Sequence, residues 1–201
     1  MFTEWLQRKV RELAKQGVVT LGLTHFSPNT ITMFGLLITA IAALVVAGGN
    51  LIAGGLILLF SSIFDILDGA VARATNRVHP YGAFLDSTTD RFSEGFVYMG
   101  LLWYFLSTGS HSLECMLVIA AFNGSLIVSY ARARAQSLNF TCDGGLFARP
   151  ERVVFTVAGL LIQPLLVPVL WILAIFTNIT AVQRIWIVWR QARAQIKSSS
   201  V

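Results

Sequence analysis

Hydrophobic residues dominate the chain from about residue 31 onward, and short polar stretches divide them into six segments. The segments cover about residues 31–49, 51–66, 92–108, 113–130, 153–167 and 168–189. Several are long enough for a helix to cross a hydrocarbon core, which takes roughly 20 apolar residues. The pattern therefore predicts an all-α integral membrane protein with six transmembrane helices. Pro164 and Pro168 interrupt the last apolar tract, and they predict a tight hairpin between the last two helices.

The chain ahead of the first predicted span has a different pattern. Residues 1–24 place apolar side chains such as Trp5 and Leu6 at near-helical spacing, with basic residues between them. This predicts an amphipathic helix that lies on the membrane surface. Ser27 and Pro28 supply a capping residue and a first helical residue, so the first span is expected to begin there. We expect one membrane domain over residues 1–201, with the six-helix bundle at about 28–190.

Composition and charge agree with membrane insertion and indicate its orientation. The chain is 55% hydrophobic and 12% charged, which is too apolar for a soluble domain of this length. Lys and Arg gather in the N-terminal segment, between spans two and three, between spans four and five, and at the C-terminus. We therefore expect both termini on the cytoplasmic side of the cell membrane. Basic residues that border spans favour anionic headgroups and phosphate substrates as partners, not nucleic acid.

Four aspartates stand out in the stretch DILDGAVARATNRVHPYGAFLDSTTD, residues 65–90. Asp65 and Asp68 are three residues apart, and Asp86 and Asp90 are four apart, so each pair shares one helical face. Two antiparallel helices would offer all four carboxylates near the cytoplasmic membrane boundary. Carboxylates in a membrane cost several kcal/mol and repel one another unless a cation is present. All-oxygen ligation favours Mg²⁺ or Mn²⁺, and four carboxylates could hold two ions.

Residues beside Asp68 indicate that the cations serve a phosphate ligand. Gly69 lets a bulky ligand approach the backbone, and Arg73 follows one turn later. An arginine beside a metal cluster is typical of phosphate binding. The alternative from the residues alone is that the aspartates form ordinary salt bridges with Arg73, Arg77 and Arg91.

The run Asp65-x2-Asp68-Gly69-x2-Ala72-Arg73-x8-Gly82-x3-Asp86-x3-Asp90 resembles the signature of the class I CDP-alcohol phosphatidyltransferases at all eight fixed positions. Length and span pattern extend the resemblance over essentially the whole chain. It implies a phospholipid synthase that transfers a phosphatidyl-type group from a CDP-linked lipid to an alcohol and releases CMP. The CDP-linked lipid would be CDP-diacylglycerol or an archaeal ether analogue. The resemblance also implies that the four aspartates bind two divalent ions and that Asp90 is the catalytic base.

The same resemblance implies a site for the CDP-linked lipid. Gly69 and Arg73 match residues that hold the cytidine diphosphate, and Gly82 matches a close-packed glycine beside it. Asn29 and Thr32, in the stretch SPNTIT, resemble a family segment near the nucleotide. From the sequence alone, SPNTIT is equally well explained as the start of a helix.

A second stretch, SYARARAQSLNFTCDGGLFARPER at residues 129–152, bears on the acceptor alcohol. It resembles the branch of the family that uses inositol phosphate, in bacterial and in archaeal ether-lipid form. That resemblance implies that Arg134, Arg152 and Arg190 hold the acceptor phosphate, with Arg184 as an alternative to Arg190. Gln136 departs from the branch, in which a glutamate is common. Read alone, such arginines are also ordinary positive-inside anchors. By analogy with the family, we expect a homodimer.

Three other interpretations remain open at this point. Glycerol 3-phosphate could be the acceptor in the same chemistry, although enzymes that use it more often have lysine where this chain has Arg91. A divalent-cation transporter would explain the aspartates, but it would leave Gly69, Arg73 and the pair Arg134 and Arg152 without a role. A membrane scaffold would need none of these residues.

Overall fold

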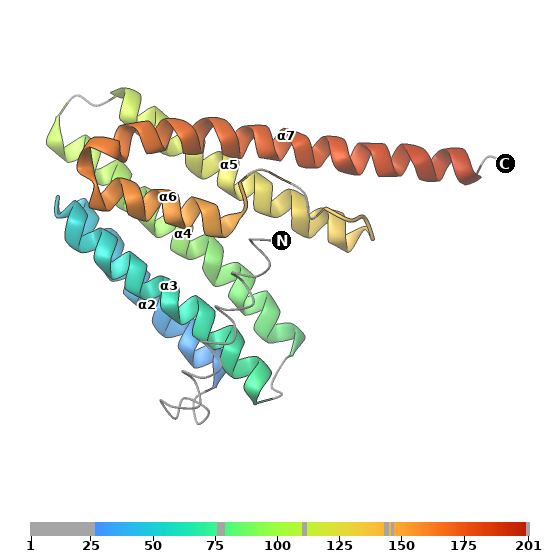
Figure 1. Ribbon diagram of the computed structural model, residues 1–201, viewed down its shortest axis with the longest axis horizontal. Helices are drawn as coiled ribbons and strands as arrows, with labels where there is room; N and C mark the ends of the chain where they lie inside the picture. Colours follow the sequence, from blue (N-terminus) through green and yellow to red (C-terminus); the bar gives the residue numbers. More distant parts are fainter. Residues whose placement is uncertain (1–26, 76–78, 110–111, 143–144, 146, 200–201) are drawn as a thin grey trace. The chain divides into compact units, whose positions relative to one another are not determined.

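The structure is a computed structural model that describes residues 27–75, 79–109, 112–142, 145 and 147–199. Every regular element in these ranges is helical, which confirms the all-α prediction. The predicted interfacial helix at residues 1–24 lies outside them. The chain divides into two compact units, Met1–Val97 and Tyr98–Val201, and the division falls within α4. The elements in chain order (Figure 1) are α2 (Pro28–Ala47), α3 (Leu51–Ala74), α4 (Pro80–Thr108), α5 (Ser112–Ser137), α6 (Arg149–Leu161), the 3-10 turn η2 (Gln163–Leu165) and α7 (Leu166–Ser199).

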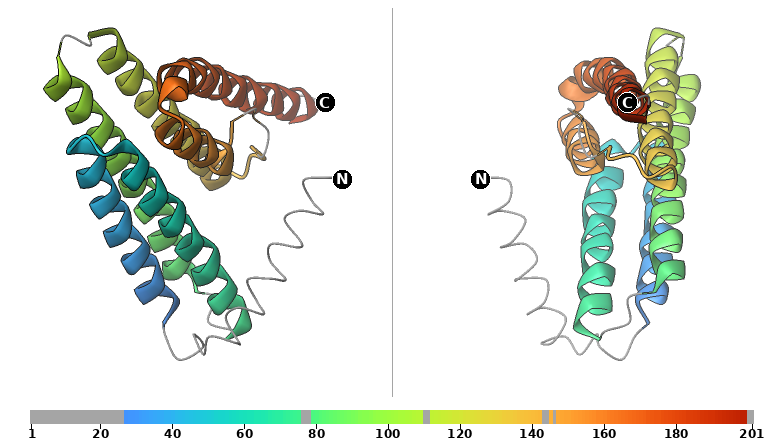
Figure 2. Two further views of the ribbon diagram at one scale, coloured as in Figure 1. Left: turned by 60° about the vertical axis from the view of Figure 1, so that its left-hand side comes forward. Right: turned by 90° about the vertical axis from the view of Figure 1, so that its right-hand side faces the viewer.

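The described part of the first unit begins with a helical hairpin made by α2 and α3. Ser27 caps α2 by accepting a hydrogen bond from the backbone N–H of Thr30 at 3.1 Å, and Pro28 occupies the first turn, as predicted. The helix ends before Gly49, whose φ of +90° is a conformation that glycine adopts without strain. Asn50 then caps α3. The turn is so short that α3 runs back beside α2, as the left view of Figure 2 shows.

Small residues and buried hydroxyl groups hold α3 against α2. A Cβ atom on Gly35 would lie 3.2 Å from the Cβ atom of Phe64, so the helices approach closely there. The hydroxyl oxygens of Thr39 and Ser61 are 2.7 Å apart, and Ser61 also donates to the carbonyl oxygen of Gly35 at 2.8 Å. Close approach and interhelical hydrogen bonds are typical of helices that pack in membranes. These contacts fix the register of α3, and with it the position of the first two aspartates.

The helices that carry the aspartates are longer than the predicted spans. The expected spans cover residues 51–66 and 92–108, whereas α3 continues to Ala74 and α4 already begins at Pro80. An apolar segment ends where charged residues begin, but a helix continues while its i→i−4 backbone hydrogen bonds are made. Asp65, Asp68, Asp86 and Asp90 therefore all lie on regular helix, which confirms the faces that their spacing predicts.

In the second unit, α5 and α6 both pack against α7. The packed core includes Leu160 of α6 with Leu170 and Leu173 of α7, all fully buried. Asn178 of α7 donates to the carbonyl oxygen of Ala120 in α5 at 3.1 Å. A half-buried amide that bonds a backbone carbonyl joins two membrane helices without leaving a polar group unsatisfied.

The predicted break between the last two helices exists, but it comes earlier than expected. The sequence places it between residues 167 and 168, whereas α6 ends at Leu161 and η2 turns the chain into α7 at Leu166. Pro164 lies in η2, while Pro168 is the third residue of α7. A proline in the first turn of a helix costs no hydrogen bond, because the N–H it lacks would have no partner there.

Four of the described helical segments are long and apolar enough to cross a membrane. They are Pro28–Ala47, Leu51–Ala72, Ser112–Ser137 and Gln163–Ile196. α6 has 13 residues and spans about 20 Å at 1.5 Å per residue, less than the roughly 30 Å of a hydrocarbon core. The apolar helices are those of a protein inserted into a membrane.

Candidate active site

The first unit gathers acidic side chains from α3 and α4. Asp68 is only 5% exposed and Asp90 is also buried, while Asp65 and Asp86 are half-buried. Asp86 and Asp65 both lie within electrostatic range of Asp68. The structure therefore brings aspartates from both ends of the motif into one region, as their spacing predicts. Such a concentration of negative charge attracts cations.

The helix α2 supplies direct support for this region. The hydroxyl group of Thr32 donates to Oδ2 of Asp68 at 2.6 Å, and the backbone N–H of Gly69 donates to Oδ1. Gly35 also belongs to α2, and a Cβ atom added to it would lie 3.4 Å from Oδ1 of Asp65. Thr32, which the sequence places near the nucleotide, thus holds one of the aspartates in position.

The other residues expected around the nucleotide lie nearby in the chain's first unit. A Cβ atom on Gly82 would lie 3.4 Å from Oδ1 of Asn29, so the start of α4 is next to the start of α2. Asn29 is half-buried. Arg73 belongs to the last turns of α3, and its side chain is outside the described part of the structure.

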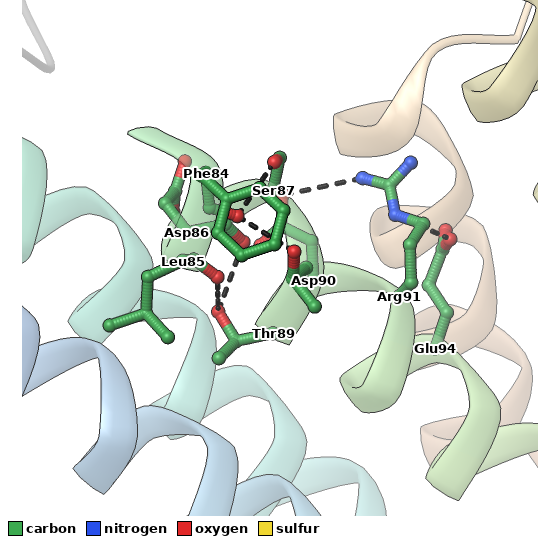
Figure 3. A network of polar contacts seen from close by, with 9 residues as sticks. Phe84, Leu85, Asp86, Ser87, Thr89, Asp90, Arg91 and Glu94 are labelled. Atoms are coloured by element: carbon green, nitrogen blue, oxygen red, sulfur yellow. Dashed lines mark hydrogen bonds and ion pairs between the residues drawn. The ribbon is translucent and has the colours of Figure 1, made fainter. Parts of the chain in front are cut away.

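A charged cluster surrounds Asp90 on α4 (Figure 3). Nη2 of Arg91 is 3.4 Å from Oδ2 of Asp90, and Nε of Arg91 is 4.0 Å from Oε2 of Glu94. Glu94 is 8% exposed, so it is buried like Asp90. The sequence motif does not include Glu94. Its signal in the sequence is the spacing, because Asp86, Asp90 and Glu94 recur every fourth residue on one helical face.

The arginines expected to hold the acceptor phosphate lie in the second unit, each with its own local partner. Arg134 is exposed near the end of α5, with Nη1 3.5 Å from Oγ of Ser137. Arg152 is 2% exposed in the first turn of α6 and donates to the carbonyl oxygen of Phe147 at 3.2 Å. Arg190 is exposed on α7, and its guanidinium lies 4.8 Å from the ring centroid of Trp186.

Arg184, the alternative to Arg190, is in a different environment. It is buried in α7, and its Nη1 donates to the carbonyl oxygen of Val128 in α5 at 2.6 Å. A Cβ atom on Gly145 would lie 3.4 Å from its Nε. The second unit therefore buries two arginines, Arg152 and Arg184.

The side chains around Asp68 fit a hard divalent cation by their chemistry. The donors are carboxylate oxygens from two helices, and such oxygens are the ligands that Mg²⁺ and Mn²⁺ prefer. Among the described residues, no three His, Cys, Asp or Glu side chains are already gathered closely enough to hold an ion. Asp65 and Asp86 interact electrostatically with Asp68, so the carboxylates share the region without meeting at one point. That spacing is expected of like charges, which repel one another.

The comparison with known proteins decides the family. The profile of the CDP-alcohol phosphatidyltransferase family matches residues 25–192, a range that runs through both compact units. The chain belongs to this family. The resemblance of the aspartate motif is thereby confirmed, and the family is one of phospholipid-synthesising transferases.

Two curated relatives narrow the likeness within the CDP-alcohol phosphatidyltransferases. The chain is 38% identical over 167 residues to the phosphatidylinositol phosphate synthase of Mycobacteroides abscessus, covering 79% of this chain and 76% of the relative. It is 36% identical over 168 residues to the archaetidylinositol phosphate synthase of Methanothermobacter thermautotrophicus, covering 81% of this chain and 83% of the relative.

Solved structures of the phosphatidylinositol phosphate synthase of Mycobacterium tuberculosis share the fold at 32% identity. The structure with CDP-DAG bound matches with a TM-score of 0.77, over 90% of this chain and 94% of that chain. The structure in complex with manganese and citrate matches with a TM-score of 0.80, over 90% of this chain and 88% of that chain.

Proposed function

We propose that this chain transfers a phosphatidyl-type group from a CDP-linked lipid to a hydroxyl group of inositol phosphate and releases CMP. The hydroxyl oxygen forms a bond to the phosphorus that carries the lipid, the bond from this phosphorus to the CMP oxygen breaks, and the hydroxyl proton passes to a base. The observation that carries the proposal is the family's aspartate motif on two helices of one compact unit, with Asp68 held by Thr32. The two relatives named for inositol phosphate lipids support the acceptor.

The four aspartates would hold two divalent cations, Mg²⁺ or Mn²⁺. When bound, such cations neutralise the pyrophosphate of the CDP-lipid and polarise it for attack. The hydroxyl group of Thr32 keeps the Asp68 carboxylate oriented toward that task. Asp90 is the base that takes the proton from the attacking hydroxyl. The manganese complex of the Mycobacterium tuberculosis relative supports the binding of a divalent cation.

The CDP-linked lipid would lie against α2, α3 and the start of α4. Gly69 and Gly82 offer backbone without side chains, so a nucleotide can approach closely, and Asn29 offers an amide beside Gly82. Arg73 would bind the diphosphate through paired, charge-assisted hydrogen bonds from its guanidinium group. The relative solved with CDP-DAG bound supports a lipid of this class.

The acceptor phosphate would be held by arginines of the second unit. Arg134 and Arg152 can chelate a dianionic phosphate through paired, charge-assisted hydrogen bonds, and Arg190 would complete the pocket. An uncharged polyol would leave these guanidinium groups without a partner. Inositol phosphate should therefore be a far better acceptor than inositol itself.

The arrangement in the membrane is part of the proposal. The bundle would have six membrane spans, the four that meet the length and hydropathy requirements and two more. Residues 1–24 would form an interfacial helix, and residues 1–201 would form one membrane domain. Both termini and the aspartates would face the cytoplasm, because the connections on that side carry the Lys and Arg residues. The active form would be a homodimer, by analogy with the family.

A panel of acceptors tests the proposal directly. The purified protein is incubated with CDP-diacylglycerol, Mg²⁺ and one acceptor at a time, and the lipid product is identified by mass. We expect CMP release and a new lipid with inositol phosphate, and little with inositol. Preferred use of glycerol 3-phosphate would contradict the assignment of inositol phosphate as the acceptor. Failure to bind CMP in the presence of Mg²⁺, together with cation flux into vesicles, would favour a transporter.

A further inference from the structure

A buried acidic residue beside the proposed base has no role in the reaction as described so far. Glu94 lies one helical turn after Asp90 on α4, and it is 8% exposed. A buried carboxylate costs several kcal/mol unless a charged or hydrogen-bonding partner compensates it. Glu94 lies on the same helical face as Asp86 and Asp90. The group that compensates the charge of Glu94 therefore also lies close to the site.

Arg91 lies between Glu94 and Asp90. Figure 3 shows its side chain between the two carboxylates, with one dashed contact to each. The Nη2 end lies 3.4 Å from Oδ2 of Asp90, and the Nε edge lies 4.0 Å from Oε2 of Glu94. The guanidinium is planar and rigid, so holding one edge fixes the direction of the other. The contact to Asp90 uses Oδ2.

We propose that Glu94 and Arg91 are positioning residues for Asp90. Glu94 anchors the guanidinium of Arg91, and the guanidinium holds the Asp90 carboxylate in the orientation in which it binds a cation and accepts the hydroxyl proton. This inference rests on the proposed function, which gives Asp90 those two tasks. Groups that orient a metal ligand from outside typically change metal affinity or activity by about 10- to 100-fold when they are altered.

Charge alone predicts a different result, which makes the inference testable. By Coulomb's law, removing the positive charge of Arg91 should strengthen cation binding, and removing the negative charge of Glu94 should weaken it. Variants that keep the charge and change only the geometry separate the two effects. Arg91→Lys keeps the charge but loses the planar fork, and Glu94→Asp keeps the carboxylate but shortens its reach by one methylene group.

The experiment measures Mn²⁺ binding to the full-length protein without substrates, by the electron paramagnetic resonance signal of free Mn²⁺. We expect Arg91→Lys and Glu94→Asp each to weaken Mn²⁺ binding about 10-fold. At saturating Mn²⁺, kcat should fall while the KM for the CDP-lipid stays within about twofold, because the ground-state lipid contacts are unchanged. Arg193→Lys on α7 and Glu114→Asp on α5 make the same chemical changes elsewhere and should bind Mn²⁺ normally. Unfolding temperatures of all variants show whether the fold is intact.

The double variant tests whether Glu94 acts through Arg91. If it does, Arg91→Lys with Glu94→Asp should bind Mn²⁺ no more weakly than the worse single variant, because the chain of contacts is already broken. The inference would be overturned if the double variant lost Mn²⁺ affinity by the product of the two single losses. It would also be overturned if both single variants bound Mn²⁺ normally. Asp90→Asn separates this from a failure of the proposed function. If Asp90→Asn weakens Mn²⁺ binding while the Arg91 and Glu94 variants do not, only the positioning pair is wrong, and normal binding in Asp90→Asn removes Asp90 from the metal centre.

Discussion

Among the described residues, the two compact units bury charged side chains of opposite sign. The first unit buries acids, namely Asp68, Asp90 and Glu94, along α3 and α4. The second unit buries bases, Arg152 in α6 and Arg184 in α7. In the second unit each buried guanidinium donates to a backbone carbonyl, whereas in the first unit a hydroxyl group and a guanidinium approach the carboxylates.

This difference indicates which ligand each unit is built to receive. A buried charge is costly unless an opposite charge or strong hydrogen bonds compensate it. Carboxylates from two helices attract a divalent cation, and guanidinium groups bind phosphate through paired, charge-assisted hydrogen bonds. Under the proposed function, the first unit would bind the cations and the diphosphate, and the second would bind the phosphate of the acceptor. Variants in each unit test this division.

Loss of one carboxylate from the first unit should have the largest effect. We expect Asp86→Asn and Asp65→Asn to reduce CMP release to background, because the proposed metal centre uses all four aspartates. Ser87→Ala, which removes an exposed hydroxyl group beside Asp86, should stay active. Turnover is measured with Mg²⁺ or Mn²⁺ present and again with excess chelator. Full activity in chelator would contradict the metal centre.

Asp90→Asn should separate chemistry from binding within the first unit. We expect kcat to fall by roughly 10²- to 10⁴-fold, the range of general base catalysis, while CDP-lipid binding falls much less. Turnover, CDP-lipid binding and metal content are measured on the same sample, since loss of metal would produce a similar defect. Equal losses of binding and turnover would make Asp90 a metal ligand alone.

Arginine variants of the second unit should affect the acceptor alone. Arg134→Ala and Arg152→Lys should raise the KM for inositol phosphate by roughly 10- to 150-fold, since each hydrogen bond to a charged group contributes about 1.5–3 kcal/mol. The KM for the CDP-lipid should stay nearly constant. Arg193→Ala, which removes an arginine that lies over Trp189, serves as the control. A raised KM for the CDP-lipid in these variants would contradict the assignment of the acceptor phosphate to the second unit.

The hydrogen bond from Thr32 to Asp68 should have the smallest of these effects. Thr32→Val removes the hydroxyl group at nearly constant volume, and Mn²⁺ binding should weaken about 10-fold, as for other groups that orient a metal ligand. Thr32→Ser keeps the hydroxyl group and should bind Mn²⁺ almost normally. Arg134→Ala, in the second unit, should leave Mn²⁺ affinity unchanged. Equal affinities in Thr32→Val and Thr32→Ser would show that the hydroxyl group does not orient Asp68.

The first unit was more predictable from the sequence than the second, for a local reason. Asp86 and Asp90 are four residues apart, so one regular helix is enough to place them on one face. Ser27 and Pro28 likewise act through adjacent backbone, and they begin α2 as predicted. Arg134, Arg152 and Arg190 lie on three helices with no fixed spacing between them, so helical periodicity says nothing about their surroundings.

The sequence by itself determined the helical class, the approximate positions of four candidate membrane spans and the family, because hydrophobic runs and a motif within 26 residues depend only on local spacing. The tertiary structure decided which long-range partners these residues meet. Thr32 reaches Asp68 across 36 positions, and Arg184 reaches Val128 across 56. Such contacts depend on how closely two helices pack and in which register. Packing of that kind arises from the small residues and shapes of both helices together, so no single stretch of sequence encodes it.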